Sequence, residues 1–182
     1  MTLSIVIDYY IKGIESMLYT YKGICQNCAT EISVTIHNGE LLEDCPDCKD
    51  VPFSLKKFTG LVYVVSNPNQ TGVKIGMTEK TVESRIKSLN TTGVAGNFKP
   101  IVIFPCERPK PDEKKIHEKL SRFNIAKEHF ELEPVEAALK CYRALNRRKP
   151  IFYDKIVEEM FHLRLEQDKI NMKIKLKGKN NH

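Results

Sequence analysis

Continuous apolar runs that are rich in β-branched residues predict strands in the middle of the chain. The run LVYVV begins at residue 61, and VKIG resumes after the turn-forming segment SNPNQTG. This pattern is typical of an antiparallel hairpin with a long loop over residues 61–76. A third strand is expected from Ile101 to Pro105, where the run IVIFP ends in a proline.

Apolar residues with helical spacing follow the predicted hairpin. Thr78 or Thr81 can cap a first helix. A second helix is expected to begin at Asp112, which can cap it, and to run through about Arg122. A third helix, in EPVEAALKCYRALNRRKP, is expected to run through Asn146. The inner face of the first helix is predicted to hold Val82, Ile86 and Leu89.

Apolar residues beyond Pro150 recur at alternating steps of four and three. This spacing favours a short heptad seam and a homodimer through the C-terminal helix, or equally a helix that lies on the core of its own chain. The lysine-rich tail that follows could touch a nucleic acid backbone, or form a solvated end. The members of the seam are Ile156, Met160, Leu163, Ile170 and Ile174, with Gln167 where a further apolar residue would fall.

Two C-x-x-C pairs lie near the N-terminus, and they indicate a metal site in that region. Cys25 and Cys28 form the first pair, and Cys45 and Cys48 form the second. Two tight turns can supply four thiolates in a tetrahedron, which suits Zn²⁺. The segment between the pairs alternates apolar and polar residues and turns at Asn38-Gly39, so it predicts a hairpin. We therefore expect a structural zinc ribbon rather than disulfides or a redox site, because strand formers and not a helix follow Cys28.

Length and charge limit the number of domains and the class of partner. The 182 residues suffice for one ordinary core and a small satellite, and the net charge of +6 favours polyanionic partners only weakly. No apolar run reaches the roughly 18 to 20 residues of a membrane span, so we expect no membrane contact and a cytoplasmic location. The expected domains are residues 1–55, 56–146 and 147–182. The expected fold class is α+β, with a small antiparallel sheet flanked by helices.

Three polar residues fall on the inner faces of the predicted helices. Arg85 lies between the apolar residues of the first helix, while Glu113 and His117 lie beside the apolar residues of the second. A guanidinium on a packing face is costly unless it meets a carboxylate, a phosphate or a cleft. The set therefore predicts a polar cleft shared by the two helices.

The segment GLVYVVSNPNQTGVKIGMTEKTVESRIKSL, followed by EKKIHEKL and EHFEL, resembles the GIY-YIG nuclease superfamily. It is closest to the phage and bacterial branch in which V-K-I-G-x-T replaces Y-I-G. The resemblance covers about residues 60–133. It implies an endonuclease that hydrolyses DNA phosphodiester bonds with one divalent cation, Mg²⁺ or Mn²⁺, in the host cytoplasm if the protein is phage-encoded. RNA is not excluded as the substrate.

The resemblance also implies roles for single residues. Tyr63 would orient the attacking water, Arg85 would contact the scissile phosphate, and Glu113 would hold the cation. Tyr63 or Lys74 could be the base, provided that the cation and Arg85 lower its pKa. A catalytic role for His117 and substrate contacts by Thr78 and Glu128 follow from the resemblance more loosely.

Lys74 occupies the position at which the wider superfamily has a tyrosine, so a second interpretation of the function is also possible. In this reading the nuclease-like domain has lost its activity, and the chain is a zinc-ribbon nucleic-acid-binding protein or a protein adaptor. In the first reading the zinc ribbon helps to position the DNA or a partner protein.

Overall fold

The computed structural model describes residues 18–56, 58–91, 93 and 95–179, and side chains through residue 174. The chain divides into two compact units, Met1–Lys57 and Phe58–His182. Each unit has its own sheet and its own buried residues. The predicted α+β class with small antiparallel sheets and flanking helices is confirmed.

The first unit is a three-stranded antiparallel sheet of strands β1 (Leu18–Ile24), β2 (Glu31–His37) and β3 (Glu40–Leu41). The predicted Asn38-Gly39 turn joins β2 to β3, and both residues have positive φ angles, 50° and 81°. Of the segment before the first cysteine pair, residues 18–24 form the strand β1, and residues 3–17 lie outside the described residues.

The second unit is built on a six-stranded sheet with the order β7-β8-β5-β4-β6-β9. The predicted hairpin is confirmed as the antiparallel pair β4 and β5, and the third strand as β6, which pairs with β4. Short strands extend both edges. The bounds are β4 (Gly60–Ser66), β5 (Val73–Thr78), β6 (Lys99–Cys106), β7 (Asn124–Ala126), β8 (His129–Phe130) and β9 (Ile151–Phe152).

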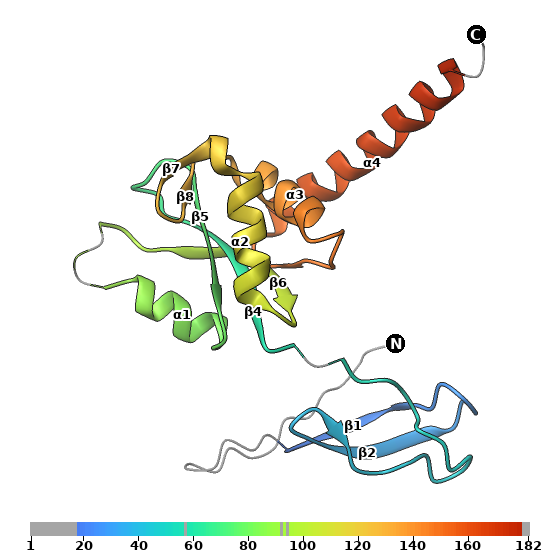
Figure 1. Cartoon of the computed structure of the whole chain (residues 1–182). Helices are drawn as coiled ribbons and strands as arrows, with labels where there is room; N and C mark the ends of the chain where they lie inside the picture. The colour runs from blue at the N-terminus through green and yellow to red at the C-terminus, as the bar shows by residue number, and fades with distance from the viewer. Residues whose placement is uncertain (1–17, 57, 92, 94, 180–182) are drawn as a thin grey trace. The chain divides into compact units, whose positions relative to one another are not determined.

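The helices α1 (Val82–Leu89), α2 (Pro109–Lys119) and α3 (Pro134–Ala144) cover the two faces of this sheet (Figure 1). Alternate residues of β4 point to opposite faces, so Val62 and Val64 join a large core with α2 and α3. Tyr63 and Val65 join a smaller core with Val82 of α1. Tyr63 therefore reaches the α1 side of the sheet.

The second helix differs from its predicted bounds at both ends. It begins at Pro109 rather than after Asp112, because proline fits the first helical position, where its missing N–H is not needed. It ends at Lys119, and the 3₁₀ turn Ser121–Phe123 follows. Glu113 thus lies in the second turn of α2. Asp112 does not cap the helix, and its Oδ2 atom instead accepts a hydrogen bond from Arg148 Nη1 at 2.5 Å.

The last helix, α4 (Lys155–Lys179), packs against α3 and β9. Its contacts to the core come from Val157, Phe161 and the partly buried Leu165. The prediction of a helix on the chain's own core is therefore right for the helix but wrong for the residues of the heptad seam. No helix in the described part of the chain is both long and apolar enough to cross a membrane.

Candidate functional site

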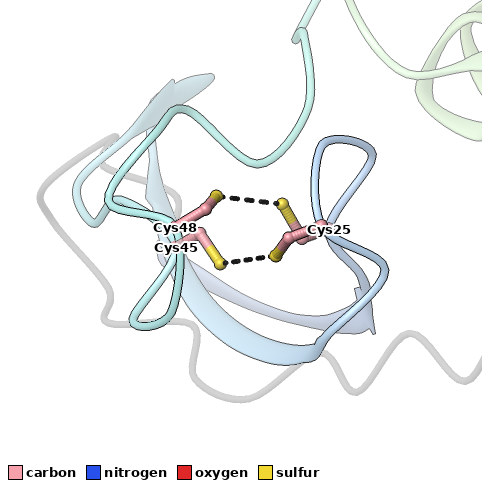
Figure 2. A group of neighbouring side chains, drawn as sticks. Cys25, Cys45 and Cys48 are labelled. Atoms are coloured by element: carbon pink, nitrogen blue, oxygen red, sulfur yellow. Dashed lines mark hydrogen bonds between the residues drawn. The ribbon is translucent and has the colours of Figure 1, made fainter.

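The four cysteines of the first unit converge on one point (Figure 2). The Sγ atoms are 3.8 Å apart between Cys25 and Cys48 and 3.6 Å apart between Cys28 and Cys45, and all four lie within 4.8 Å of one another. Four sulfurs bound to Zn²⁺ at about 2.3 Å in a tetrahedron would be separated by about 3.8 Å. The cluster could therefore hold a zinc ion with little rearrangement.

The two cysteine turns have the same backbone structure. Ala29 N–H donates to Cys25 O at 3.0 Å, and Lys49 N–H donates to Cys45 O at 3.0 Å. The residue after each second cysteine, Ala29 or Lys49, has φ = 62°. A non-glycine residue in this left-handed region is uncommon, so its occurrence at both turns indicates that the backbone is arranged around a shared centre.

Cys28 and Cys48 have pKa values far from that of an ordinary thiol. Hydrogen bonds with Thr30 lower the pKa of Cys28 to about 6. A backbone hydrogen bond at Asp50 lowers the pKa of Cys48, but burial and the three neighbouring sulfurs raise it to about 12. Four sulfurs at this distance cannot all ionise without a cation between them, which is the chemistry of a zinc ligand set.

In the second unit, a phenol and a guanidinium meet on the α1 side of the sheet. Tyr63 Oη accepts hydrogen bonds from Arg85 Nε at 3.0 Å and from Arg85 Nη2 at 2.8 Å. Tyr63 is 1% exposed. Arg85 reaches it from α1, which Thr81 caps by accepting a hydrogen bond from Ser84 N–H at 3.2 Å. The guanidinium on the inner face of this helix is thus stabilised by the phenol.

Burial is the main influence on the pKa of Tyr63 and raises it above the ordinary value. The hydrogen bonds from Arg85 lower the pKa, while the charges of Glu128 and Glu113 raise it. The contribution of Arg85 has the expected sign, but desolvation by burial is larger, so the pKa of Tyr63 is raised by the protein groups alone.

Gly76 makes room for this phenol from the neighbouring strand. It is the cross-strand partner of Tyr63, and a Cβ atom there would lie 2.4 Å from Tyr63 Oη and 3.1 Å from Glu128 Oε2. The requirement is for space, because a methyl group at this position would overlap a buried ring.

We predict that Gly76→Ala displaces Tyr63, breaks its contact with Arg85 and lowers the free energy of unfolding by about 1–3 kcal/mol. Thermal unfolding measures the loss. Gly93→Ala is the matched control, since a Cβ atom at Gly93 meets nothing within 4 Å. Adding Tyr63→Leu to Gly76→Ala should restore part of the stability, and a failure to do so would assign the loss to another cause.

The edge of β5 that extends past β8 is covered by two side chains of α2. His117 Nε2 donates to Ile75 O at 2.9 Å, and the backbone of Met77 lies near enough to Glu113 to favour its carboxylate and lower its pKa. This explains why both polar residues lean toward the packing side of the helix. His117 satisfies a backbone carbonyl of β5 at a point where no described strand pairs with this edge.

Glu113 and His117 also line an open pocket of about 550 Å³, together with Lys110 and Lys114. Burial raises the pKa of Glu113; His117 opposes this shift, and Glu128 adds to it. All residues that line this pocket belong to the α2 segment. The pocket is therefore not the polar cleft shared by two helices that the sequence predicts. Arg85 and Tyr63 lie on the α1 side of β5, and the charge of Glu113 acts on Tyr63 from beyond the strand.

Lys74 and Glu128 form an ion pair next to these groups. Lys74 Nζ lies 2.5 Å from Glu128 Oε2, and Glu128 O accepts the hydrogen bond of Ile75 N–H at 2.9 Å. His129 is the cross-strand partner of Lys74, and burial and the charge of Lys74 lower the pKa of its imidazole. We did not predict a role for His129. The only signal in the sequence is its place directly after Glu128.

Thr78 is buried at the end of β5, where its Oγ1 atom accepts a hydrogen bond from Lys80 N–H at 3.0 Å. This bond forms the turn from β5 into α1, which places Arg85. The expected contact of Thr78 with a substrate stays a prediction.

The structure thus gathers six of the predicted residues around one stretch of β5, from three strands or turns and two helices. They provide a guanidinium, a phenol, an ammonium, two carboxylates and an imidazole. The six are Tyr63, Lys74, Arg85, Glu113, His117 and Glu128. Residues 60–146 match the family model of the T5orf172 domain.

The T5orf172 domain is a phage-associated nuclease-like domain related to the GIY-YIG nucleases. The match covers 87 of the 182 residues and includes all of the predicted site residues except the four cysteines. The resemblance to GIY-YIG nucleases is therefore supported through a related family and not by a direct match. Searches of curated proteins and of solved structures found no match.

Proposed function

We propose that the T5orf172 region is a metal-dependent endonuclease that hydrolyses phosphodiester bonds of DNA. The observation that carries this proposal is the Tyr63–Arg85 contact beside β5, with Glu113 close enough for its charge to act on Tyr63. Phosphodiester hydrolysis needs a cation and a guanidinium to stabilise charge on the phosphoryl oxygens, and a group that orients water.

Arg85 would bind the scissile phosphate, and Tyr63 would hold Arg85 in place. A neutral phenol that accepts two hydrogen bonds has no acceptor site left, so its O–H can only donate. In this state Tyr63 can orient a water molecule or a phosphate oxygen by donation. It becomes a base only as phenolate, and burial makes this ionisation harder.

Lys74 is the other candidate for the base. Its ammonium is paired with Glu128, so it too must lose a proton before it can accept one from water. If Tyr63 is the base, the rate should increase with pH above neutrality, because burial raises the pKa of the phenol.

Glu113 is the residue that would hold Mg²⁺ or Mn²⁺. Its carboxylate lines an open pocket, and its raised pKa indicates that the charged form is poorly solvated, which a cation would correct. When bound, such a cation supplies charge neutralisation at the phosphate and lowers the pKa of a coordinated water.

Plasmid nicking in Mg²⁺ or Mn²⁺ tests the proposal, with Glu113→Gln as the inactive variant. Glu113→Gln should abolish nicking and keep DNA binding, because the amide preserves shape but not charge. If the wild-type protein binds DNA and nicks it under neither cation, the chain is a binding protein or an adaptor with an inactive domain. The ion pair between Lys74 and Glu128 is the observation that favours this second function.

The same variant should be more stable than the wild-type protein at neutral pH. The pKa of Glu113 is raised in the folded protein, so its ionised form opposes folding at pH values above that pKa. The neutral amide removes this cost, so the Tm should rise at pH 7, by about 2–4 °C for each kcal/mol gained. The gain should vanish below about pH 4, where the unfolded carboxyl is protonated as well. Equal Tm values at pH 7 would contradict the raised pKa.

We also propose that the cysteine cluster binds one structural Zn²⁺, and that the ribbon positions a protein partner rather than DNA. Residues 1–57 hold five lysines and arginines and eight acidic residues, a net charge of −3. Residues 58–182 hold 24 lysines and arginines and 15 acidic residues, a net charge of +9. Phosphate contacts need basic groups, so the charge favours a basic partner for the ribbon and DNA for the second unit.

A further inference from the structure

The helix α4 has two apolar faces, and only one of them is used by its own domain. Val157, Phe161 and Leu165 pack into the core beside α3 and β9. Beyond Leu165 every described side chain through Ile174 is exposed, and Figure 1 shows this part of α4 running away from the sheet.

The second apolar face is the heptad seam, and it is exposed along its whole length. The exposed fractions of its apolar side chains run from 41% at Met160 to 74% at Ile156. At about 100° per residue, the seam lies on the side of the helix opposite to Phe161. One apolar face of α4 packs on its own domain, and the second, with apolar residues at steps of four and three, is suited to pack against another helix.

We propose that the seam of α4 pairs with the same seam of a second copy of this chain, as a parallel two-stranded coiled coil. In heptad terms Met160, Gln167 and Ile174 are at a positions, and Ile156, Leu163 and Ile170 are at d positions. A seam of this length is marginal for free peptides. Here the domain already holds the first turns of the helix, which removes much of the ordering cost.

The charges beside the seam select a second copy and a parallel direction. Glu159 at a g position faces Arg164 at the e position of a parallel copy, and this pair occurs twice in the dimer. In an antiparallel pair centred on the same seam, Arg164 would face its own copy and Glu166 would face its own copy. Both contacts would be repulsive and would offset the attraction between Glu159 and Lys173 in that arrangement.

Gln167 supports the same direction. In a parallel pair the two Gln167 side chains meet and can hydrogen-bond with each other, while in the antiparallel pair each would face Leu163 and lose its partner. A polar residue at one a position is a known means to fix the register of such a helix pair.

Sedimentation equilibrium or light scattering on the full chain tests the dimer. The wild-type protein should approach twice the 20.9 kDa of one chain as its concentration rises. Leu163→Glu with Ile170→Glu should return the mass to that of one chain. Met172→Glu is the matched control, because Met172 is an exposed apolar residue of α4 outside the seam, and it should leave the dimer intact.

A wild-type mass that stays at 20.9 kDa up to about 100 μM, or a dimer that survives the seam substitutions, overturns the proposal. A dimer lost in Met172→Glu as well would overturn the assignment to the seam, because another face of the helix would then be used. All three positions are exposed, so the fold should not change, and circular dichroism checks this.

A charge swap tests the direction. Glu159→Lys and Arg164→Glu should each weaken the dimer, and the double variant should restore it if the helices are parallel. In the antiparallel arrangement the new lysine at position 159 would face Lys173, and the new glutamate at position 164 would face its own copy. The double variant would then be no stronger than Glu159→Lys alone, so loss without rescue overturns the parallel arrangement.

The consequence for catalysis rests on the proposed function. A parallel pair brings two nuclease domains to the same end of the helix pair, so one assembly would carry two sites. Wild-type protein should then convert a nicked plasmid into a linear one faster than the Leu163→Glu, Ile170→Glu variant, which should still nick. The masses test the dimer even if neither protein cuts DNA.

Discussion

Arg85→Ala is expected to slow DNA cleavage by about 10²–10³-fold, which corresponds to about 2.7–4 kcal/mol of transition-state stabilisation. Among the described residues the guanidinium has no hydrogen-bonded carboxylate partner, and it is held instead by the neutral phenol of Tyr63. A cation held by a neutral group keeps its charge for a ligand, and a phosphate is the ligand expected here. Single-turnover cleavage of a labelled duplex measures the effect on the chemical step.

Two further variants separate this role from a general loss of positive charge. Arg122→Ala removes an exposed arginine that lies over the ring of Phe123, 4.5 Å from its centroid, and should leave cleavage nearly unchanged. Arg85→Lys keeps the charge but cannot give two hydrogen bonds to one phenol oxygen, so most of the loss should persist.

A double-mutant cycle with Tyr63→Phe tests whether the phenol acts through Arg85. If Tyr63 only positions the guanidinium, Tyr63→Phe should add little to the loss in Arg85→Ala. Additive losses would give Tyr63 a separate role, as the group that orients water. Cleavage within a factor of about three of wild type in Arg85→Ala would contradict the proposed site.

The hairpin, the first helix and the cysteine turns could be predicted from the sequence because their signals are local. The alternation around Asn38-Gly39 and the apolar run before SNPNQTG need no knowledge of distant residues. Short edge strands have no such signal: β8 and β9 have two residues each, and they exist because an existing sheet provides a partner. The predicted start of α2 was wrong because Pro109 and Pro111 are typical of a loop, although proline also fits the first turn of a helix.

The residues of the candidate site could be named from the sequence, but their arrangement could not. That Glu113 and His117 lean inward followed from helical spacing, whereas their contact with the edge of β5 depends on where α2 packs. The space that Gly76 leaves for Tyr63 depends on strand register, which a sequence fixes only through all its pairs together.

Loss of zinc is expected to unfold the first unit and to leave the second unit folded. In the described part of the first unit the buried residues are Cys25, Ile32, Val34, Cys45 and Pro52. So few residues cannot offset the entropy of ordering a segment of this length. Structural zinc supplies about 10–16 kcal/mol in small zinc domains, so nearly all of the folding free energy should come from the metal.

The variant Cys25→Ser with Cys48→Ser should therefore bind no zinc, against one ion per wild-type chain, as measured by atomic absorption. Limited proteolysis should then cleave before residue 58 and leave residues 58–182 intact, since the two units have separate cores. Cys141→Ala is the matched control: Cys141 is buried in the second unit, and its loss should leave the zinc content unchanged.

The same pair of proteins decides what the ribbon binds. If the acidic ribbon has no phosphate contacts, the zinc-free variant should bind DNA within about threefold of wild type, with the same dependence on salt concentration. Each lost phosphate contact would instead lower the slope of log K against log[salt] by about 0.9. A slope lowered by about 0.9 or more would show that the ribbon contacts DNA. An unchanged slope would support a basic protein as the partner of residues 1–57, whose net charge is −3.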